Sequence, residues 1–180
     1  QSDITVGMIF ICLQAGHEGR TSGKTGAPGE QELTVRIRNK VSQLLQQRGF
    51  MIQLVNADPP KSEINKDFDL FLSLHGDADI YRDANKNSVG GGAVGSGDKS
   101  VDTSWEKSAK IRDAIRAEYF KHSGIEDHPE RVGVNMTKYY MWAQLTDKTP
   151  CVLLEMGVVQ NPHDKVILAD TDIVSNAIVR

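Results

Sequence analysis

The sequence predicts an α/β domain: a mixed, largely parallel sheet of about five or six strands, with helices on both faces in a three-layer arrangement. Two observations support this fold class. Short apolar runs, such as 8–14 and 151–155, lack the polar alternation of a half-exposed strand, which is typical of strands that are covered on both faces. Segments with helical spacing separate these runs. At 180 residues, the chain suits one domain over 1–180.

The first strand and helix are predicted from adjoining patterns. The apolar run 8–14 is the first strand, and a glycine-rich loop over 15–29 follows it. The segment 30–49 has an apolar stripe with helical spacing, and Gly49 ends it. The stripe consists of Leu33, Ile37, Val41, Leu44 and Leu45. The sequence therefore predicts a long amphipathic helix directly after the loop.

Two more strands precede a long polar segment. Residues 50–55 and 68–74 are apolar runs, and Ser62 between them is a candidate cap of a short helix. The segment 76–102 is polar and rich in glycine between 90 and 97. A connection of this length is typically either functional or mobile.

The C-terminal part returns to helix and strand patterns. Residues 103–106 (Thr-Ser-Trp-Glu) form a capping-box pattern that predicts the start of a helix. One face of this helix would carry Ser108, Ile111, Ile115 and Tyr119. We expect a loop over 121–138, a strand over 139–145 and a buried strand over 151–155. Asn161-Pro162 predicts the cap and first turn of a terminal helix.

Composition argues against several classes of protein. The net charge of −3 provides no basic surface for nucleic acid, and no apolar stretch approaches the ~18 residues of a membrane span. Residues 1–7 show no signal-peptide pattern. We therefore expect no nucleic-acid partner and no membrane span, and we also expect a monomer. Cys12 and Cys151 lie in apolar strands, so buried free thiols are favoured, and a disulfide stays open.

Four polar residues mark points where predicted strands or helices begin or end. His17 follows the first strand, Glu30 opens the first helix, and His75 and Glu155 end later strands. Because buried strands of an α/β sheet place their C-terminal ends at one edge, these residues can be neighbours. Two imidazoles and a carboxylate are the donors that an open catalytic zinc site needs. A half-buried carboxyl group such as Glu155 suits a general base.

Each candidate also has a simpler interpretation. His17 alone is also explained as an exposed loop residue, and Glu30 as an acid that favours a helix N-terminus. Three other histidines have loop or surface surroundings and are interpreted as solvated: His122, His128 and His163. Of these, His128 is the best placed to approach a substrate. Gly23-Lys24-Thr25 matches the tail of a P-loop, but position 18 is Glu where that motif requires Gly.

Taken together, five motifs resemble one known family. In order they are Ala-Gly-His-Glu-Gly (15–19), Gly-Glu (29–30), Leu-Leu-Gln-Gln-Arg-Gly-Phe (44–50), Asp-Leu-Phe-Leu-Ser-Leu-His (69–75) and Pro-Cys-Val-Leu-Leu-Glu-Met-Gly-Val-Val-Gln-Asn-Pro (150–162). Their order and spacing are similar to those of the zinc-dependent N-acetylmuramoyl-L-alanine amidases of the amidase_3 type. That family includes bacterial cell-wall enzymes and phage endolysin catalytic domains. The resemblance covers nearly the whole chain.

The resemblance implies a role for each candidate residue. His17, Glu30 and His75 match the family's Zn²⁺ ligands, and Glu155 matches its catalytic glutamate. Glu30 is preferred to Glu32 because of its spacing from the Leu44-Leu45 pair. The implied activity is hydrolysis of the amide bond between N-acetylmuramic acid and L-alanine in peptidoglycan, at the bacterial cell wall.

The segment after His75 departs from the family pattern, and it leaves the substrate subsites open. We expect the glycine-rich loop 85–100 to border the cleft, with a solvated connector as the alternative and 121–145 as the cleft wall in that case. The autoinhibitory helical insertion of the family is not evident over 76–102, and the resemblance therefore implies an open, accessible cleft. Alternative functions are another zinc peptidase or carboxypeptidase-type hydrolase, a non-catalytic wall-binding module, or a nucleotide-dependent enzyme that uses Gly23-Lys24-Thr25.

Overall fold

The computed structural model describes residues 8–180, and its strands form one mixed sheet. The strands are β1 (Phe10–Ala15), β2 (Met51–Val55), β3 (Leu70–Asp77), β4 (Ala93–Ser96) and β5 (Cys151–Val158). Their spatial order is β2-β1-β3-β5-β4. The first four of these are parallel to one another, and β4 runs antiparallel to β5 at the edge. The predicted five- or six-stranded, largely parallel sheet is confirmed.

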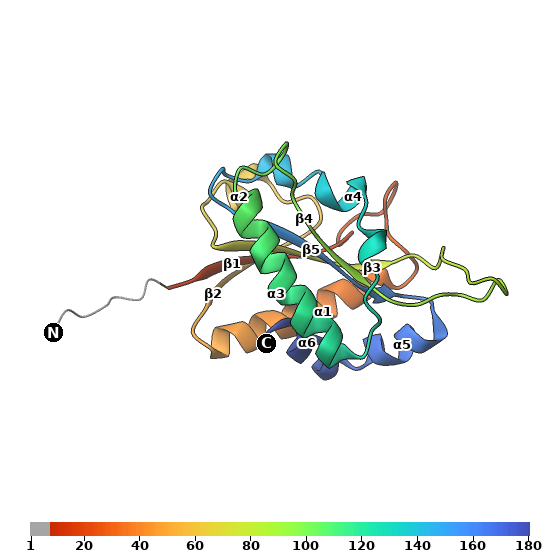
Figure 1. Cartoon of the computed structure of the whole chain (residues 1–180). Helices are drawn as coiled ribbons and strands as arrows, with labels where there is room; N and C mark the ends of the chain where they lie inside the picture. The colour runs from red at the N-terminus through yellow and green to blue at the C-terminus, as the bar shows by residue number, and fades with distance from the viewer. Residues whose placement is uncertain (1–7) are drawn as a thin grey trace.

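Helices cover both faces of this sheet, as predicted. They are α1 (Glu30–Gln47), α2 (Lys61–Ile64), α3 (Trp105–Ser123), α4 (Val134–Thr137), α5 (Pro162–Ala169) and α6 (Thr171–Ile178), with short 3-10 turns η1 (Pro129–Arg131) and η2 (Trp142–Gln144). Figure 1 shows α1 and α6 on one side of the sheet and the short α2 and α4 on the other. Helix α3 packs on α6, β4 and β5 and contributes Tyr119 to the same core as α1 and α6. Among the helices of residues 8–180, none combines the length and apolar character needed to cross a bilayer.

The face under α1, α3 and α6 is lined mainly by apolar side chains, and we call it the helix-covered face. Leu13, Leu72 and Leu74 point into it from the central strands and are almost completely buried. They pack against the predicted stripe of α1, where Ile37 and Val41 are fully buried. Because burying each such side chain contributes roughly 1.5–3 kcal/mol, this face supplies most of the hydrophobic stabilisation.

The opposite face, which we call the pocket face, has an apolar core only at one end. Cys12, Phe71 and Cys151 are register partners across β1, β3 and β5. They pack against the side chains Ile64, Phe68, Met136, Met141 and Trp142. Both cysteines are buried free thiols, which confirms the favoured interpretation. The covering elements α2 and α4 are short, so they leave the C-terminal ends of the strands open on this side.

Part of the segment predicted to be a polar connection is the edge strand β4. Glycines in and directly after β4 allow close packing: a Cβ on Gly95 would lie 2.8 Å from the Met136 Cβ, and one on Gly97, just past the strand, would lie 2.5 Å from the Asp102 Cβ. Conversely, the strand predicted over 139–145 is wrong, because these residues form a turn and η2. Aromatic residues favour strands only where a partner strand is available, and this segment instead packs onto the pocket face.

Cap predictions were correct for one helix and wrong for two. Asn161 caps α5 by accepting hydrogen bonds from the amides of His163 and Asp164. Ser62, in contrast, lies inside α2, which begins after Pro60. Ser104 precedes α3, but its hydroxyl donates to the Asp147 carbonyl rather than capping the helix. The terminal segment forms two helices because Asp170 ends α5 and caps α6.

Candidate metal centre and pocket

The parallel strands bring the predicted site residues to one edge of the sheet. His75 and Glu155 are register partners on β3 and β5, so their side chains lie on the same face. Gly16 continues β1 by one residue, since its amide donates to the Leu74 carbonyl at 2.8 Å. A Cβ on Gly16 would lie only 2.5 Å from the His75 ring. Only glycine therefore leaves room for this imidazole beside β1.

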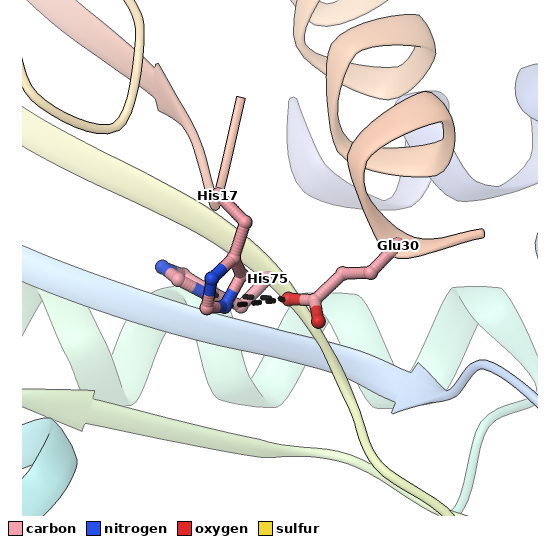
Figure 2. Close-up of side chains that lie close together, drawn as sticks. All are labelled: His17, Glu30 and His75. Atoms are coloured by element: carbon pink, nitrogen blue, oxygen red, sulfur yellow. Dashed lines mark ion pairs between the residues drawn. The ribbon is translucent and has the colours of Figure 1, made fainter. Parts of the chain in front are cut away.

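His17, Glu30 and His75 converge on one point although they come from three different segments. Figure 2 shows both imidazoles directed at the Glu30 carboxylate. The distance from His17 Nε2 to Glu30 Oε1 is 3.3 Å, and that from His75 Nδ1 to the same oxygen is also 3.3 Å. One donor atom from each residue lies within 4.8 Å of the others. Two nitrogens and one oxygen in this arrangement can hold a single metal ion.

The carboxylate of Glu30 is fixed by backbone amides. Ala27 N–H donates to Oε2 at 2.8 Å, and Gly76 N–H donates to Oε1 at 3.1 Å. Burial acts to raise the pKa of Glu30, but the hydrogen bond and charge of His75, the Ala27 amide and the charge of His17 together lower it below the usual value. Glu30 is therefore ionised and preoriented toward both imidazoles.

His17 is held by the loop that contains Gly23-Lys24-Thr25, the segment that matches the tail of a P-loop. Its backbone is left-handed, with φ of 61°, a conformation that costs free energy in a non-glycine residue and is concentrated at functional sites. Its Nδ1–H donates to the Lys24 carbonyl at 2.7 Å. Since a carbonyl only accepts, Nδ1 carries a proton in this bond, and Nε2 is the nitrogen that faces Glu30. The Gly23-Lys24-Thr25 segment thus orients a histidine.

His75 is buried and hydrogen-bonded on the side away from Glu30. Its Nε2 lies 3.2 Å from the hydroxyl of Tyr139. Burial lowers the pKa of His75 below its usual value, and Glu30 only partly offsets this effect. A neutral imidazole is the form that binds metal ions.

Glu155 faces the same space with an unused acceptor. Its Oε2 is buried and has no hydrogen-bond partner among the described residues. Burial raises the pKa of Glu155 well above its usual value, and the charges of Asp77 and Glu30 raise it further. A buried polar atom without a partner is rare and requires an explanation. A proton, a water molecule or a substrate group at this position would provide one.

A pocket of about 340 Å³ opens onto these groups. It is lined by His17, Arg20, Lys24, His75, Asn135, Tyr139, Tyr140, Leu153 and Glu155. Arg20 is bound by both carboxylate oxygens of Asp58 at 2.7 Å and lies over the Tyr140 ring. The sequence did not point to Arg20 as a pocket residue, and it pointed to Tyr139 and Tyr140 only as part of the alternative cleft wall 121–145. The only signal for these pocket residues in the sequence was the Tyr139-Tyr140 pair, and it was interpreted as part of the predicted strand over 139–145.

One wall of the pocket comes from 121–145, the alternative to the glycine-rich loop, and another comes from the loop after β1 through Arg20 and Lys24. Among the described residues, none from 85–100 lines the pocket. His128, expected to be solvated but able to approach a substrate, is partly buried, hydrogen-bonds Glu130 at 2.6 Å and lies against Gly91. His122 pairs with Glu118 on α3, and His163 is largely exposed, as expected.

Two acids that compete with Glu30 in the sequence point elsewhere. Glu18, which directly follows His17, forms an ion pair with Arg38. Glu32 is exposed on the first turn of α1. The fold therefore brings Glu30, and neither of the other two, to the imidazoles.

The chain is similar in sequence to known proteins. A sequence model described as Amidase_3, N-acetylmuramoyl-L-alanine amidase, matches residues 11–179. The probable cell wall amidase LytH of Staphylococcus aureus is 24% identical over 167 residues, which are 89% of this chain and 51% of that relative. The chain thus spans about half the length of the curated relatives it matches.

Solved structures share the fold. The N-acetylmuramoyl-L-alanine amidase AmiC2 of Nostoc punctiforme superposes with a TM-score of 0.69 at 19% identity, covering 96% of this chain and 93% of that one. The amidase Ami1 of Mycobacterium smegmatis gives a TM-score of 0.73 at 16% identity, covering 95% and 93%.

Proposed function

The chain belongs to the Amidase_3 family of N-acetylmuramoyl-L-alanine amidases, and on that premise we propose that it hydrolyses peptidoglycan at the bond between N-acetylmuramic acid and L-alanine. The observation that carries this proposal is the convergence of His17 Nε2, His75 Nδ1 and Glu30 Oε1 beside the pocket. The protein would act at the bacterial cell wall, and peptidoglycan would bind at the pocket.

The three donors fit a zinc ion. Zinc prefers nitrogen and oxygen donors of this kind, and a catalytic site has three protein ligands and one open position. Each imidazole is held on its far side, by Lys24 O or by Tyr139, so that the other nitrogen faces Glu30. Such outer hydrogen bonds are typical of metal-binding histidines. We therefore propose His17, Glu30 and His75 as the ligands.

Zinc, when bound there, supplies a Lewis acid that polarises a carbonyl oxygen and lowers the pKa of water. Glu155 is the group that we propose moves the proton. Its free Oε2 accepts a proton from the attacking water and returns it to the departing L-alanine nitrogen. A carboxyl group whose pKa is raised by burial gives up a proton less easily than an exposed one, so it can hold the proton between the two steps.

The pocket residues orient the substrate in this proposal. Tyr139 and Tyr140 provide aromatic edges, and Arg20 and Lys24 provide cations on the side of His17. Arg20 is rigid because Asp58 and Tyr140 hold it. Positioning of the scissile amide by fixed groups reduces the entropy that must be lost in the reaction.

The test is a digestion of purified peptidoglycan, with and without chelation of the metal. We expect new N-terminal L-alanine, loss of this product after chelation and its recovery after zinc is restored. Release of other ends, such as D-alanine, would indicate a carboxypeptidase-type hydrolase. Wall binding without any released product would indicate a non-catalytic module, and either result would contradict the proposal.

A further inference from the structure

Gln14 is a buried polar residue in the middle of the sheet. It lies on β1 directly beside Ser73 of β3, facing the pocket side, and its side chain has no solvent exposure. It lies one layer below His75 and does not line the pocket. A buried amide is costly unless its hydrogen bonds are satisfied, so its partners show what it does.

All four hydrogen bonds of the Gln14 amide are made. The Nε2 group donates to the carbonyls of Asn56 and Ala57, each at 3.1 Å. The Oε1 atom accepts from the Ser73 hydroxyl at 2.7 Å and from the Tyr139 hydroxyl at 3.2 Å. Because both N–H groups face carbonyls, the amide has only one orientation, with its oxygen toward Ser73 and Tyr139.

This orientation fixes the direction of the next bond. Tyr139 has one proton, which points to Gln14 Oε1 at 3.2 Å or to the Tyr140 hydroxyl at 3.4 Å. In both cases the Tyr139 oxygen faces His75 Nε2 as an acceptor, at 3.2 Å. A neutral imidazole has a single N–H. When Nδ1 binds a metal ion, that proton must be on Nε2, where the Tyr139 oxygen accepts it; without a metal ion, Nδ1 faces the Glu30 carboxylate at 3.3 Å.

We propose that Gln14 is a positioning residue that acts through Tyr139: it holds the Tyr139 oxygen in place as the acceptor for Nε2–H of His75 when His75 binds a metal ion through Nδ1, and we call this arrangement the Gln14–Tyr139–His75 relay. This inference rests on the metal centre of the proposed function. With a metal ion bound, the two histidines would have opposite tautomers, because the Lys24 carbonyl accepts from Nδ1 of His17 and the Tyr139 oxygen accepts from Nε2 of His75.

The first test reads the His75 Nε2–H proton directly in the zinc-loaded protein. Long-range ¹H–¹⁵N spectra distinguish a protonated from an unprotonated ring nitrogen, and a His75→Gln variant assigns the signals. We expect a slowly exchanging Nε2–H in the parent and faster exchange of this proton with water in Tyr139→Phe and Gln14→Met. An Nε2 without a proton in the zinc-loaded parent, or an unchanged exchange rate in both variants, would overturn the proposal. Neither result depends on amidase activity.

The second test measures zinc affinity by competition with a chromophoric chelator. Loss of an outer hydrogen bond to a metal-binding histidine typically costs about 10–100-fold in affinity, and we expect this for Tyr139→Phe and Gln14→Met. Because Gln14 acts through Tyr139, the double variant should bind zinc no more than about twofold more weakly than Tyr139→Phe. The relay would be overturned if the affinity losses of the two single variants multiplied in the double variant. It would also be overturned if the zinc affinity of Tyr139→Phe were within twofold of the parent's.

A matched control separates this effect from general destabilisation. Tyr119 is buried, and its hydroxyl donates to the Met156 carbonyl at 2.7 Å, on the helix-covered face. Tyr119→Phe should lower the melting temperature and leave zinc affinity unchanged. If it weakened zinc binding as much as Tyr139→Phe, the relay would be rejected. If the parent bound no zinc, the proposed function would fail. Zinc binding by the parent that Tyr139→Phe leaves unchanged would overturn the relay alone.

Discussion

The two faces of the central sheet are built from alternate residues of the same strands, yet one forms the main apolar core and the other carries the pocket. Leu74 and His75 are neighbours on β3: Leu74 belongs to the apolar core under α1, α3 and α6, and His75 lies beside the pocket. Alternation along a strand separates the two roles by one residue. The comparison shows how a short strand can contribute to stability and to chemistry at once.

The pocket face becomes polar row by row toward the C-terminal ends of the strands. The first row is Cys12, Phe71 and Cys151, the second is Gln14, Ser73 and Leu153, and the third contains His75 and Glu155. The helix-covered face has no such gradient: Leu13, Leu72 and Leu74 are all apolar. Polar groups are buried on the pocket face because hydrogen bonds offset their desolvation. The comparison predicts that mutations on the two faces affect different measurements.

The largest effect is expected for His75→Ala. The change removes one of three donors, so the variant should bind no stoichiometric zinc and show no peptidoglycan hydrolysis above background. The zinc-free variant should keep the melting temperature of the zinc-free parent within a few degrees, because the helix-covered core is untouched. Metal analysis checks the first point, and a full equivalent of zinc per chain would contradict the ligand assignment.

Glu155→Gln should leave zinc bound and the fold intact but slow hydrolysis. The amide cannot accept the proton that we assign to Oε2, and general acid–base groups typically contribute about 10²–10⁴ in rate. Release of N-terminal L-alanine and metal content are measured on the same sample. Loss of zinc together with activity would show instead that Glu155 is a ligand.

Leu74→Ala is the matching change on the helix-covered face. Leu74 is fully buried, and removing such a side chain typically costs about 2–5 kcal/mol of unfolding free energy. Denaturant unfolding should show this loss, while the folded variant should bind zinc with nearly parental affinity. A large loss of zinc affinity at constant stability would mean that the two faces are not independent.

The smallest effect is expected for Glu32→Ala, which serves as the control variant for Glu30→Ala. Glu32 is exposed on the first turn of α1, so its loss should change stability by no more than about 0.5 kcal/mol and leave zinc content at the parental level. Glu30→Ala should abolish zinc binding. The reverse outcome in metal analysis would place the ligand two residues later in the chain.

The sequence alone predicted those features that depend on nearby residues. The strand 8–14 and the stripe of the helix 30–49 are local patterns, and they led to β1 and α1. His17, Glu30 and His75 each stand at the end of such an element, and parallel strands align their ends at one edge. Their proximity followed from fold class and position, because a strand end fixes where its last side chain lies.

Other features depend on partners that are distant in sequence, and only the tertiary structure determined them. Nothing local marks Gln14 as the residue that orients Tyr139, since 125 positions separate them. Tyr139 and Tyr140 have strand-forming side chains but line the pocket, while β4 forms among glycines because β5 offers it an edge. Strand formation and buried hydrogen bonds are satisfied by whichever groups the fold brings together. The local pattern of the chain does not contain that information.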